Sequence, residues 1–329
     1  MSKAKIIAIF NQKGGVAKTT TAINFSIELV NRGKKVLLVD ADQQEHMARS
    51  LGVKSKDIKA TLYTILVSEI YNKPYKKDLS NVIKHTAIGV DVLPGSVDMA
   101  GIDEIIYSIS PKDSPAVNFL HDYDNDRDNL RTRIDEAGGA QYMMGFAKIV
   151  NTYNEAQGYF YDRMEELEFL IKRTDGKKLL NTILSRVSDD YDYIIIDCPP
   201  GLSAITKNVL IAADRVIVPA IPDPYSVTGI VSLVTTVKDI KKSDNPTLEF
   251  SGLLYTMVEK NRSAITEVMG QSEEIVERFM YIYDSTIPRS TAVNQALLSG
   301  VPLIQYQKNN PTRLAYSDFC DEFLSREDI

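Results

Sequence analysis

The loop at residues 11–21, Asn-Gln-Lys-Gly-Gly-Val-Ala-Lys-Thr-Thr-Thr, constrains the fold of this chain more than any other stretch. An apolar run, Ile6–Phe10, precedes it and an amphipathic segment, Ala22–Arg32, follows it, which is the order of strand, glycine loop and helix found around phosphate sites. Gly14 and Gly15 lack a Cβ, so backbone N–H groups can approach an anion closely. The helix that follows would direct its free N–H groups and positive dipole end at the same point. We therefore expect a phosphate site here.

Two lysines separate this loop from the usual pattern G-x-x-x-x-G-K-[ST]. Lys18 and Thr19 occupy the lysine and hydroxyl positions, where the lysine would reach the β- and γ-phosphates and the hydroxyl would hold Mg²⁺. The two glycine positions hold Gln12 and Ala17 instead, and a second lysine, Lys13, precedes the glycine pair. One lysine suffices in an ordinary loop of this kind, so the second requires its own explanation. A solvated Lys13 in an accidental Gly-Gly turn is the plainer interpretation, and the flanking strand and helix argue against it.

The composition is that of an ordinary water-soluble globular chain. The 329 residues are 44% hydrophobic and 25% charged, with a formal net charge of −6. No apolar run approaches the roughly 18 residues of a membrane helix, and the first residues lack the pattern of a signal peptide. Two cysteines, Cys198 and Cys320, give no disulfide framework, and three scattered histidines suggest no metal site. We expect a cytoplasmic protein of one large α/β domain or two small ones.

Two further apolar runs end in carboxylates. Lys35–Asp42 is a continuous apolar strand of the kind buried in parallel sheets, and it ends in Asp40 and Asp42. Tyr191–Gly201 contains an apolar strand that ends in Asp197, followed by two prolines and a glycine that start a turn. Because ligands of such sheets bind beyond the carboxyl ends of the strands, we expect these carboxylates beside the phosphate loop, with Asp197 positioning Mg²⁺ through water. A strand-end turn without a ligand is the alternative for Asp40 and Asp42.

The remaining patterns complete an α/β fold, a doubly wound and mostly parallel sheet flanked by helices, as in P-loop nucleotide hydrolases. The expected helices are residues 60–70, 179–187, 226–240 and 311–324, and the further expected strands are residues 90–93, 215–219, 250–257 and 280–283. In the last helix, Leu314, Phe319 and Phe323 are expected to form the core face. Cys198 is expected to be a small buried neighbour of Asp197 rather than a nucleophile.

Residues 104–178 interrupt this alternation, and we interpret them as an insertion, mainly helical or loop, within a single domain of residues 1–329. The segment has 14 acidic and 10 basic residues, so it holds −4 of the net charge of −6, and a helix is expected near residues 159–173. A calcium loop starting at its acidic run, residues 122–128, would need glycine and glutamate at the positions of Arg127 and Arg133, so the sequence favours a solvated loop. The insertion is either a tolerated surface elaboration or a lid, a partner-binding surface or added dimer interface.

The segment Lys13–Thr20 resembles the deviant Walker A motif of the ParA/MinD superfamily, with a specific likeness to ParA-type partition ATPases of the Soj-like branch. Supporting stretches in the order of that family are residues 36–44, 193–200, 252–257 and 287–290. Two substitutions depart from the family's pattern, because Gln43 stands at its usual proline and Ala17 at its usual glycine. Ala17 would be costly if that position needed a positive φ.

The resemblance implies that two subunits sandwich two ATP molecules and that Lys13 of one subunit reaches the phosphates held by the other. It also implies that Asp42 orients the attacking water, that Asp40 supports Asp42, and that Asp197 is the Walker B acid. The catalytic residues would be Lys13, Lys18, Asp42 and Asp40. The nucleotide-binding residues would be Gly14, Gly15, Val16, Ala17, Lys18, Thr19, Thr20, Met257 and Pro288. The Mg²⁺ residues would be Thr19 directly and Asp197 and Asp42 through water.

The function that the resemblance implies is ATP-dependent DNA partition, with ATP and Mg²⁺ as cofactors. The ATP-bound homodimer would bind DNA without sequence preference, associate with the nucleoid, and be released when a ParB-type centromere-binding protein stimulates slow hydrolysis. Lys238, Lys241, Lys242, Arg262 and Arg289 are candidate DNA contacts or else solvated charges. We expect no N-terminal DNA-binding domain like that of the longer plasmid partition ATPases, because the loop begins at once.

The main alternative is a MinD-like spatial regulator, or another ATP-switch protein of the same superfamily. Membrane targeting would require a basic amphipathic C-terminal helix, and Asp318, Asp321 and Glu322 argue against one, so no membrane partner is expected. A nitrogenase-reductase-type protein would need cluster-binding cysteines, and a bacterial tyrosine kinase usually ends in a tyrosine cluster. The sequence has neither pattern.

Overall fold

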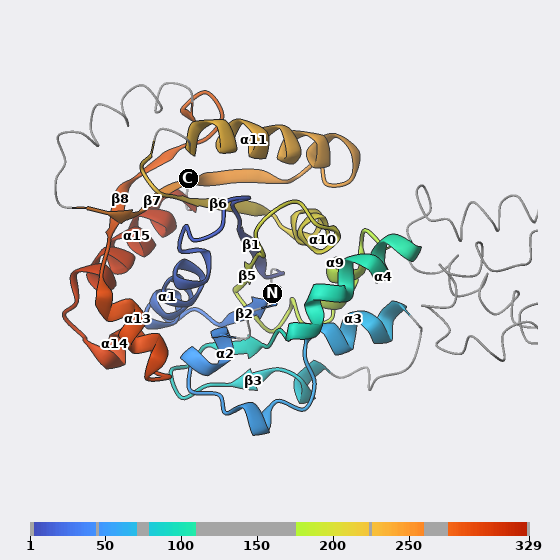
Figure 1. Ribbon diagram of the computed structural model, residues 1–329, viewed down its shortest axis with the longest axis horizontal. Helices are drawn as coiled ribbons and strands as arrows, with labels where there is room; N and C mark the ends of the chain where they lie inside the picture. Colours follow the sequence, from blue (N-terminus) through green and yellow to red (C-terminus); the bar gives the residue numbers. More distant parts are fainter. Residues whose placement is uncertain are drawn as a thin grey trace, which may run out of the picture.

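The computed structural model describes residues 3–43, 46–70, 79–109, 176–223, 226–259 and 276–327. In these residues eight strands form one sheet in the order β3-β4-β2-β5-β1-β6-β7-β8. All neighbouring strands run parallel except β3 and β4 at one edge. Figure 1 shows helices on both sides of the sheet, which confirms the predicted doubly wound α/β fold.

The strands are β1 Lys5–Ile9, β2 Val36–Asp40, β3 Lys84–His85, β4 Asp91–Leu93, β5 Tyr193–Asp197, β6 Arg215–Ala220, β7 Glu249–Val258 and β8 Ile282–Pro288. The α-helices are α1 Lys18–Asn31, α2 His46–Ser50, α3 Leu62–Ile70, α4 Ile102–Ile109, α9 Leu179–Leu184, α10 Ala204–Ala212, α11 Ser226–Ser243, α13 Thr291–Leu298, α14 Leu303–Tyr306 and α15 Pro311–Glu327. In the described ranges the short 3₁₀ helices are η1 Ser55–Asp57, η2 Leu79–Asn81 and η3 Val97–Gly101.

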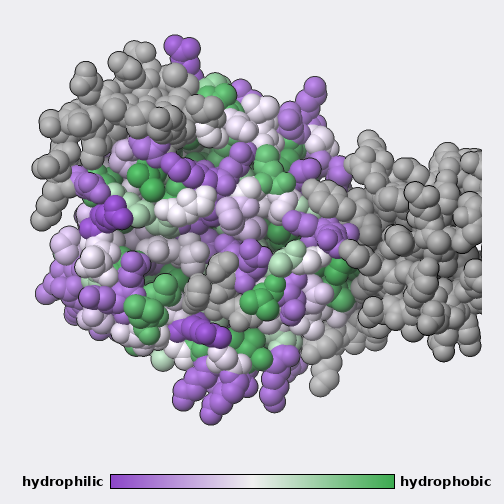
Figure 2. All heavy atoms as spheres, in the orientation of Figure 1, coloured by the Kyte–Doolittle hydropathy of each residue, from purple (hydrophilic) through white to green (hydrophobic). Residues whose placement is uncertain are grey.

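Apart from their end residues the central strands are apolar, as expected for a sheet that is covered on both faces. Side chains alternate across a strand, so Ile6 and Ala8 of β1 face the layer with α3, α4, α9, α10 and α11. Ile7 and Ile9 face the opposite layer, with α1, α2 and α15. Figure 2 shows hydrophilic and apolar residues interspersed over the described part of the surface in this view, whereas the large apolar side chains concentrate in the two buried layers.

Helix α15 holds α1 against the sheet through both apolar and polar contacts. Phe25 of α1 packs against Phe319 and Phe323, with ring centroids 5.1 and 4.9 Å apart. Nearer the start of α1, the hydroxyls of Thr21 and Tyr316 are 3.0 Å apart in the buried core. The helix that follows the glycine loop is therefore fixed along its length.

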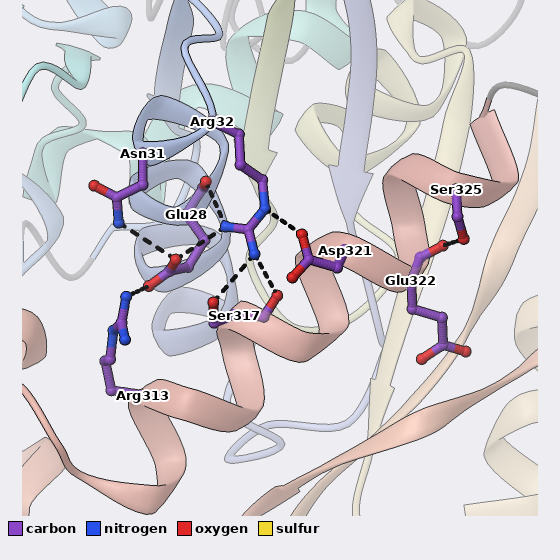
Figure 3. Close-up of polar contacts among 8 residues, drawn as sticks. All are labelled: Glu28, Asn31, Arg32, Arg313, Ser317, Asp321, Glu322 and Ser325. Atoms are coloured by element: carbon purple, nitrogen blue, oxygen red, sulfur yellow. Dashed lines mark hydrogen bonds and ion pairs between the residues drawn. The ribbon is translucent and has the colours of Figure 1, made fainter.

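A polar cluster joins the last turns of α1 to α15 (Figure 3), and we call it the α1–α15 cluster; its members are Glu28, Arg32, Arg313, Ser317 and Asp321. The Glu28 residue is only 2% exposed, and its carboxylate accepts from Arg32 and Arg313 at 3.0 Å each. Arg32 also donates to the Asp321 carboxylate at 2.6 Å and to the Ser317 carbonyl at 2.8 Å. Two guanidinium groups thus satisfy one carboxylate that burial would otherwise penalise.

Several predicted boundaries were wrong. The last strand, expected at residues 280–283, is β8 at Ile282–Pro288, and the helix expected at 179–187 ends at Leu184. Leu314 was expected in the core face of α15, but it is 43% exposed, and Tyr316 is buried instead. At about 100° per residue, Leu314 points to the side of the helix opposite Phe323, whereas Tyr316 lies on the face of Phe319 and Phe323, so the helical period itself favours Tyr316. The predicted helix at 159–173, the acidic run at 122–128 and most of the predicted insertion lie outside the described residues.

Candidate nucleotide site

The glycine loop connects β1 to α1 at the carboxyl end of the sheet. Gly15 and Ala17 both have positive φ, 71° and 62°, and α1 begins at Lys18 directly afterwards. For alanine this left-handed conformation costs on the order of 1–2 kcal/mol, so the strain that the sequence raised at Ala17 is present. A Cβ built on Gly14 would meet no atom within 4 Å, so the backbone is open to an approaching anion at that point.

Lys18 lies inside this loop with its side chain turned inward. The residue is 6% exposed, and its Nζ donates to the Lys13 carbonyl oxygen at 3.0 Å. Burial lowers the pKa of Lys18, and the nearby carboxylates of Asp197 and Asp42 act in the opposite direction. A buried ammonium with one carbonyl partner retains donors that can serve an anion.

Asp40 ends β2, Asp42 follows two residues later, and Asp197 ends the adjacent β5, so parallel pairing brings the strand ends together. The register places Asp40 opposite Asp197 in the two strands. The Asp42 N–H donates to Asp40 Oδ1 at 3.2 Å, and Asp40 is 2% exposed. Burial raises the pKa of Asp40 well above its usual range, and the charge of Asp197 raises it further. Asp40 is thus a buried support for the Asp42 backbone.

Asp197 is fully buried beside the start of α1. Burial raises its pKa to about 7, the Thr19 hydroxyl and Lys18 act in the opposite direction, and the charge of Asp42 raises it. Within the described residues, neither carboxylate oxygen of Asp197 nor Oδ1 of Asp42 has a hydrogen-bond partner of standard geometry. Buried oxygens of this kind indicate a missing partner such as water or a hydrated cation.

Gly95 packs closely against Asp40, the last residue of β2, and Asp42. A Cβ on this residue would lie 2.8 Å from the carbonyl oxygens of both Asp40 and Asp42, and 3.0 Å from the Asp40 carboxyl carbon. Gly95 lies two residues after β4 and was not predicted as part of the site. Its close approach to a neighbouring strand end is a tertiary feature that no local pattern carries.

A cavity of about 220 Å³ lies next to these groups. Its polar side comprises Thr19, Thr20, Asp40, Asp42 and Asp197, and its apolar side comes largely from α13 and α14. In the described residues no group of three or more His, Cys, Asp or Glu side chains has the geometry of a metal site. Mg²⁺ is usually held by one or two carboxylates together with substrate phosphates and water, and the hydroxyl and carboxylates here suit that mode.

Met257 and Pro288 lie together at the ends of β7 and β8, where Val258 pairs with Pro288. Met257 has a positive φ of 55°. The hydroxyl of the preceding Thr256 donates to the Val16 carbonyl at 3.1 Å, which ties this strand end to the glycine loop. Met257, which follows Thr256, therefore lies next to the glycine loop, and Pro288 lies beside it in the neighbouring strand.

The Lys13 side chain pairs with an acid outside the group of Asp40, Asp42 and Asp197. Its side chain is 47% exposed, and Nζ contacts the Asp223 carboxylate at 2.6 Å. The Lys13 N–H donates to Asn11 Oδ1 at 3.0 Å, and Asn11 Nδ2 donates to the Pro219 carbonyl at 2.8 Å. Asp223 and Asn11 were not predicted as site residues, although Asn11 stands at the strand end where the loop begins.

The candidate DNA contacts are dispersed. On α11, Lys238 lies 4.6 Å from the centroid of the Phe279 ring, and Lys241 is 3.9 Å from the Glu249 carboxylate. Arg289 pairs with the exposed Glu259 at 3.1 Å, and Arg262 lies outside the described residues.

Among the described residues no helix is long and apolar enough to cross a membrane.

Comparison with known proteins matches residues 4–128 and 161–250 to a family described as an AAA domain. The sporulation initiation inhibitor protein Soj of Bacillus subtilis (strain 168) is 30% identical over 97% of this chain and 97% of its own length. The chromosome partitioning protein ParA of Caulobacter vibrioides (strain NA1000 / CB15N) is 27% identical over 98% of this chain and 95% of its own. Among solved structures, the septum site-determining protein MinD of Pyrococcus horikoshii OT3, complexed with Mg-ADP, covers 97% of this chain and 95% of its own, with a TM-score of 0.61 and 20% identity.

Proposed function

Because the chain belongs to the AAA-domain family of ParA-type ATPases in the ParA/MinD superfamily, we propose that it is a DNA-partition ATPase switched by ATP-dependent dimerisation. In this proposal each subunit binds one ATP, and the ATP-bound pair binds DNA without sequence preference. A ParB-type centromere-binding protein stimulates hydrolysis and releases the pair from the nucleoid. The protein would act in the cytoplasm.

The observation that carries this proposal is the opposite placement of the two loop lysines. Lys18 is buried at the head of α1 beside Asp197, whereas the Lys13 side chain leaves the loop toward solvent. A phosphate bound at the head of α1 would be contacted by Lys18 of the same subunit. Lys13 could contribute charge stabilisation to phosphates in a facing subunit, as an arginine finger does.

The residues around the loop have the chemistry that Mg-ATP requires. Thr19 offers a hydroxyl ligand, and Asp197 and Asp42 offer unpartnered oxygens that could hold the waters of the cation. When bound, Mg²⁺ would neutralise charge on the β- and γ-phosphates. Asp42 would orient the attacking water, and Asp40 and Gly95 would hold Asp42 in position. Met257 and Pro288 would border the adenine.

The first experiment measures binding to an arbitrary duplex DNA with ATP or ADP across a salt series. We expect binding with ATP only, and a steep decrease with salt, because phosphate contacts by lysine and arginine release counterions. Lys238→Ala and Lys242→Ala would test α11 as the contact surface, with Lys54→Ala near η1 as a matched lysine control. Equal binding with ATP and ADP, or none, would contradict the proposal.

A second experiment separates the two lysines. Lys18→Ala should abolish nucleotide binding, whereas Lys13→Ala should leave binding of nucleotide to the monomer intact and abolish hydrolysis. Normal ATP hydrolysis by the Lys13 variant would refute its role across the dimer. Vesicle sedimentation tests the MinD-like alternative, which α15 does not favour because Tyr316, Phe319 and Phe323 are already buried against the core.

A further inference from the structure

The contact between Lys13 and Asp223 joins the glycine loop to the segment that follows β6. Asp223 lies three residues after the end of β6 and precedes α11. Asn11 connects the same two regions, since its side chain accepts from the Lys13 N–H and donates to Pro219. The backbones that carry Lys13 and Asp223 are therefore held in a fixed relation, and their 2.6 Å ion pair follows from that relation.

We propose that Asp223 is the resting partner of Lys13, holding this lysine on its own subunit and opposing premature pairing of subunits. The inference rests on the proposed role of Lys13 across the dimer. Lys13 cannot extend toward a facing subunit while its Nζ remains 2.6 Å from Asp223 Oδ2. On dimerisation Lys13 must therefore leave the Asp223 carboxylate and bind the phosphates of the partner subunit's nucleotide.

The exposure of the pair suits an exchangeable contact. The side chains of Lys13 and Asp223 are 47% and 25% exposed, so water competes with the ion pair and it is weak. The buried Glu28 carboxylate, with a side chain 3% exposed, illustrates the opposite case of an ion pair that could not open without a large cost. A triphosphate carries more negative charge than a carboxylate or a diphosphate, so the exchange favours subunits that hold ATP.

The weakness of the pair also sets the expected size of its effect. An exposed ion pair changes an equilibrium by up to about fivefold, and a dimer must open two of them. Removing the carboxylate charge should therefore tighten the dimer by about 3- to 25-fold. The change should appear in the dimer dissociation constant, and not in the affinity of a monomer for nucleotide.

The test is Asp223→Asn, studied by sedimentation with a non-hydrolysable ATP analogue and Mg²⁺. Asp244→Asn is a matched control, because Asp244 pairs with Lys177 at 3.3 Å and their side chains are 21% and 45% exposed. We expect the Asp223 variant to dimerise about 3- to 25-fold more tightly than wild type and the Asp244 variant to behave as wild type. In a Lys13→Gln background the Asp223 substitution should have no effect.

An unchanged or weaker dimer in the Asp223 variant, with thermal unfolding like that of the control, would overturn the inference. A weaker dimer would mean that Asp223 contributes to the interface instead. The proposed function is tested separately, by whether the wild-type protein dimerises with the ATP analogue but fails to dimerise with ADP. If wild type remains monomeric and Asp223→Asn dimerises, the resting contact is supported; if neither dimerises, both proposals are refuted.

Discussion

Glu28 provides the sharpest test of how this protein fixes the helix behind its nucleotide site. The residue is 2% exposed and accepts from two guanidinium groups, those of Arg32 and Arg313, at 3.0 Å each. Glu28→Gln keeps the shape and one acceptor oxygen but removes the charge that both cations face. Breaking a buried pair by removing one partner costs about 3–5 kcal/mol. Because the Arg32 and Arg313 side chains are 19% and 17% exposed, and Arg32 keeps Asp321 and Ser317, we expect the lower end, about 3 kcal/mol.

The assay is urea unfolding of Glu28→Gln beside Asp321→Asn. Asp321 contacts the same Arg32, but its side chain is 67% exposed, so its loss should cost at most about 1 kcal/mol. Adding Arg313→Gln to the Glu28 variant should cost less than it does in wild type, since the two substitutions remove the same interaction. Equal effects of the Glu28 and Asp321 variants would show that burial of the Glu28 carboxylate does not determine how much it contributes to the free energy of unfolding.

Three further predictions concern the site itself. Burial raises the pKa of Asp197 from 3.8 to about 7, so between these values the native state keeps a proton that the unfolded state has lost. This group should lower the free energy of unfolding by roughly 4 kcal/mol as pH rises from about 4 to 7, and Asp197→Asn should reduce the slope in urea titrations without abolishing it, because the pKa of Asp40 is raised as well. Ala17→Gly relieves a φ of 62° at the cost of chain entropy, so denaturation should show a change between zero and about 1 kcal/mol stabilising, whereas Ala17→Val should destabilise. Gly95→Ala places a methyl 2.8 Å from the carbonyl oxygens of Asp40 and Asp42. The free energy of unfolding should fall by about 1–3 kcal/mol, and an ATPase assay should show slower turnover. Unchanged values of both would mean that the strands shift freely to accept the methyl.

The buried parallel strands were the most predictable part of the fold. Runs such as residues 36–40 and 193–197 are short, almost entirely apolar and contain several β-branched residues, a pattern that favours strands of a parallel sheet buried on both faces. Helices α10, α13 and α14 were missed. In α10, eight of nine residues are buried, so the polar face that marks an amphipathic helix is nearly absent. Helices α13 and α14 share a small separate core of Ala292, Ala296 and Leu303, which gives little periodic signal.

The candidate site, like the fold, has residues that the sequence predicted and residues that it did not. Lys18, Thr19, Asp40, Asp42 and Asp197 were predicted as neighbours because each stands at a strand end or helix start, and parallel pairing brings such positions to one edge. Their roles in binding and hydrolysis stay predictions. Gly95 and Asp223 could not be found, because each acts on a residue far away in the chain. Their importance depends on distances that no spacing rule encodes.

The sequence by itself determined a glycine loop between a buried strand and a helix, the carboxylates at neighbouring strand ends, and the presence of two lysines in one loop. These follow from local patterns, since strand burial, helix initiation and loop geometry are set by residues near in the chain. The tertiary structure decided which way each lysine points. Lys18 is directed inward by the start of α1, and Lys13 is held outward by Asp223, because β6 runs beside β1 and delivers that carboxylate to the loop.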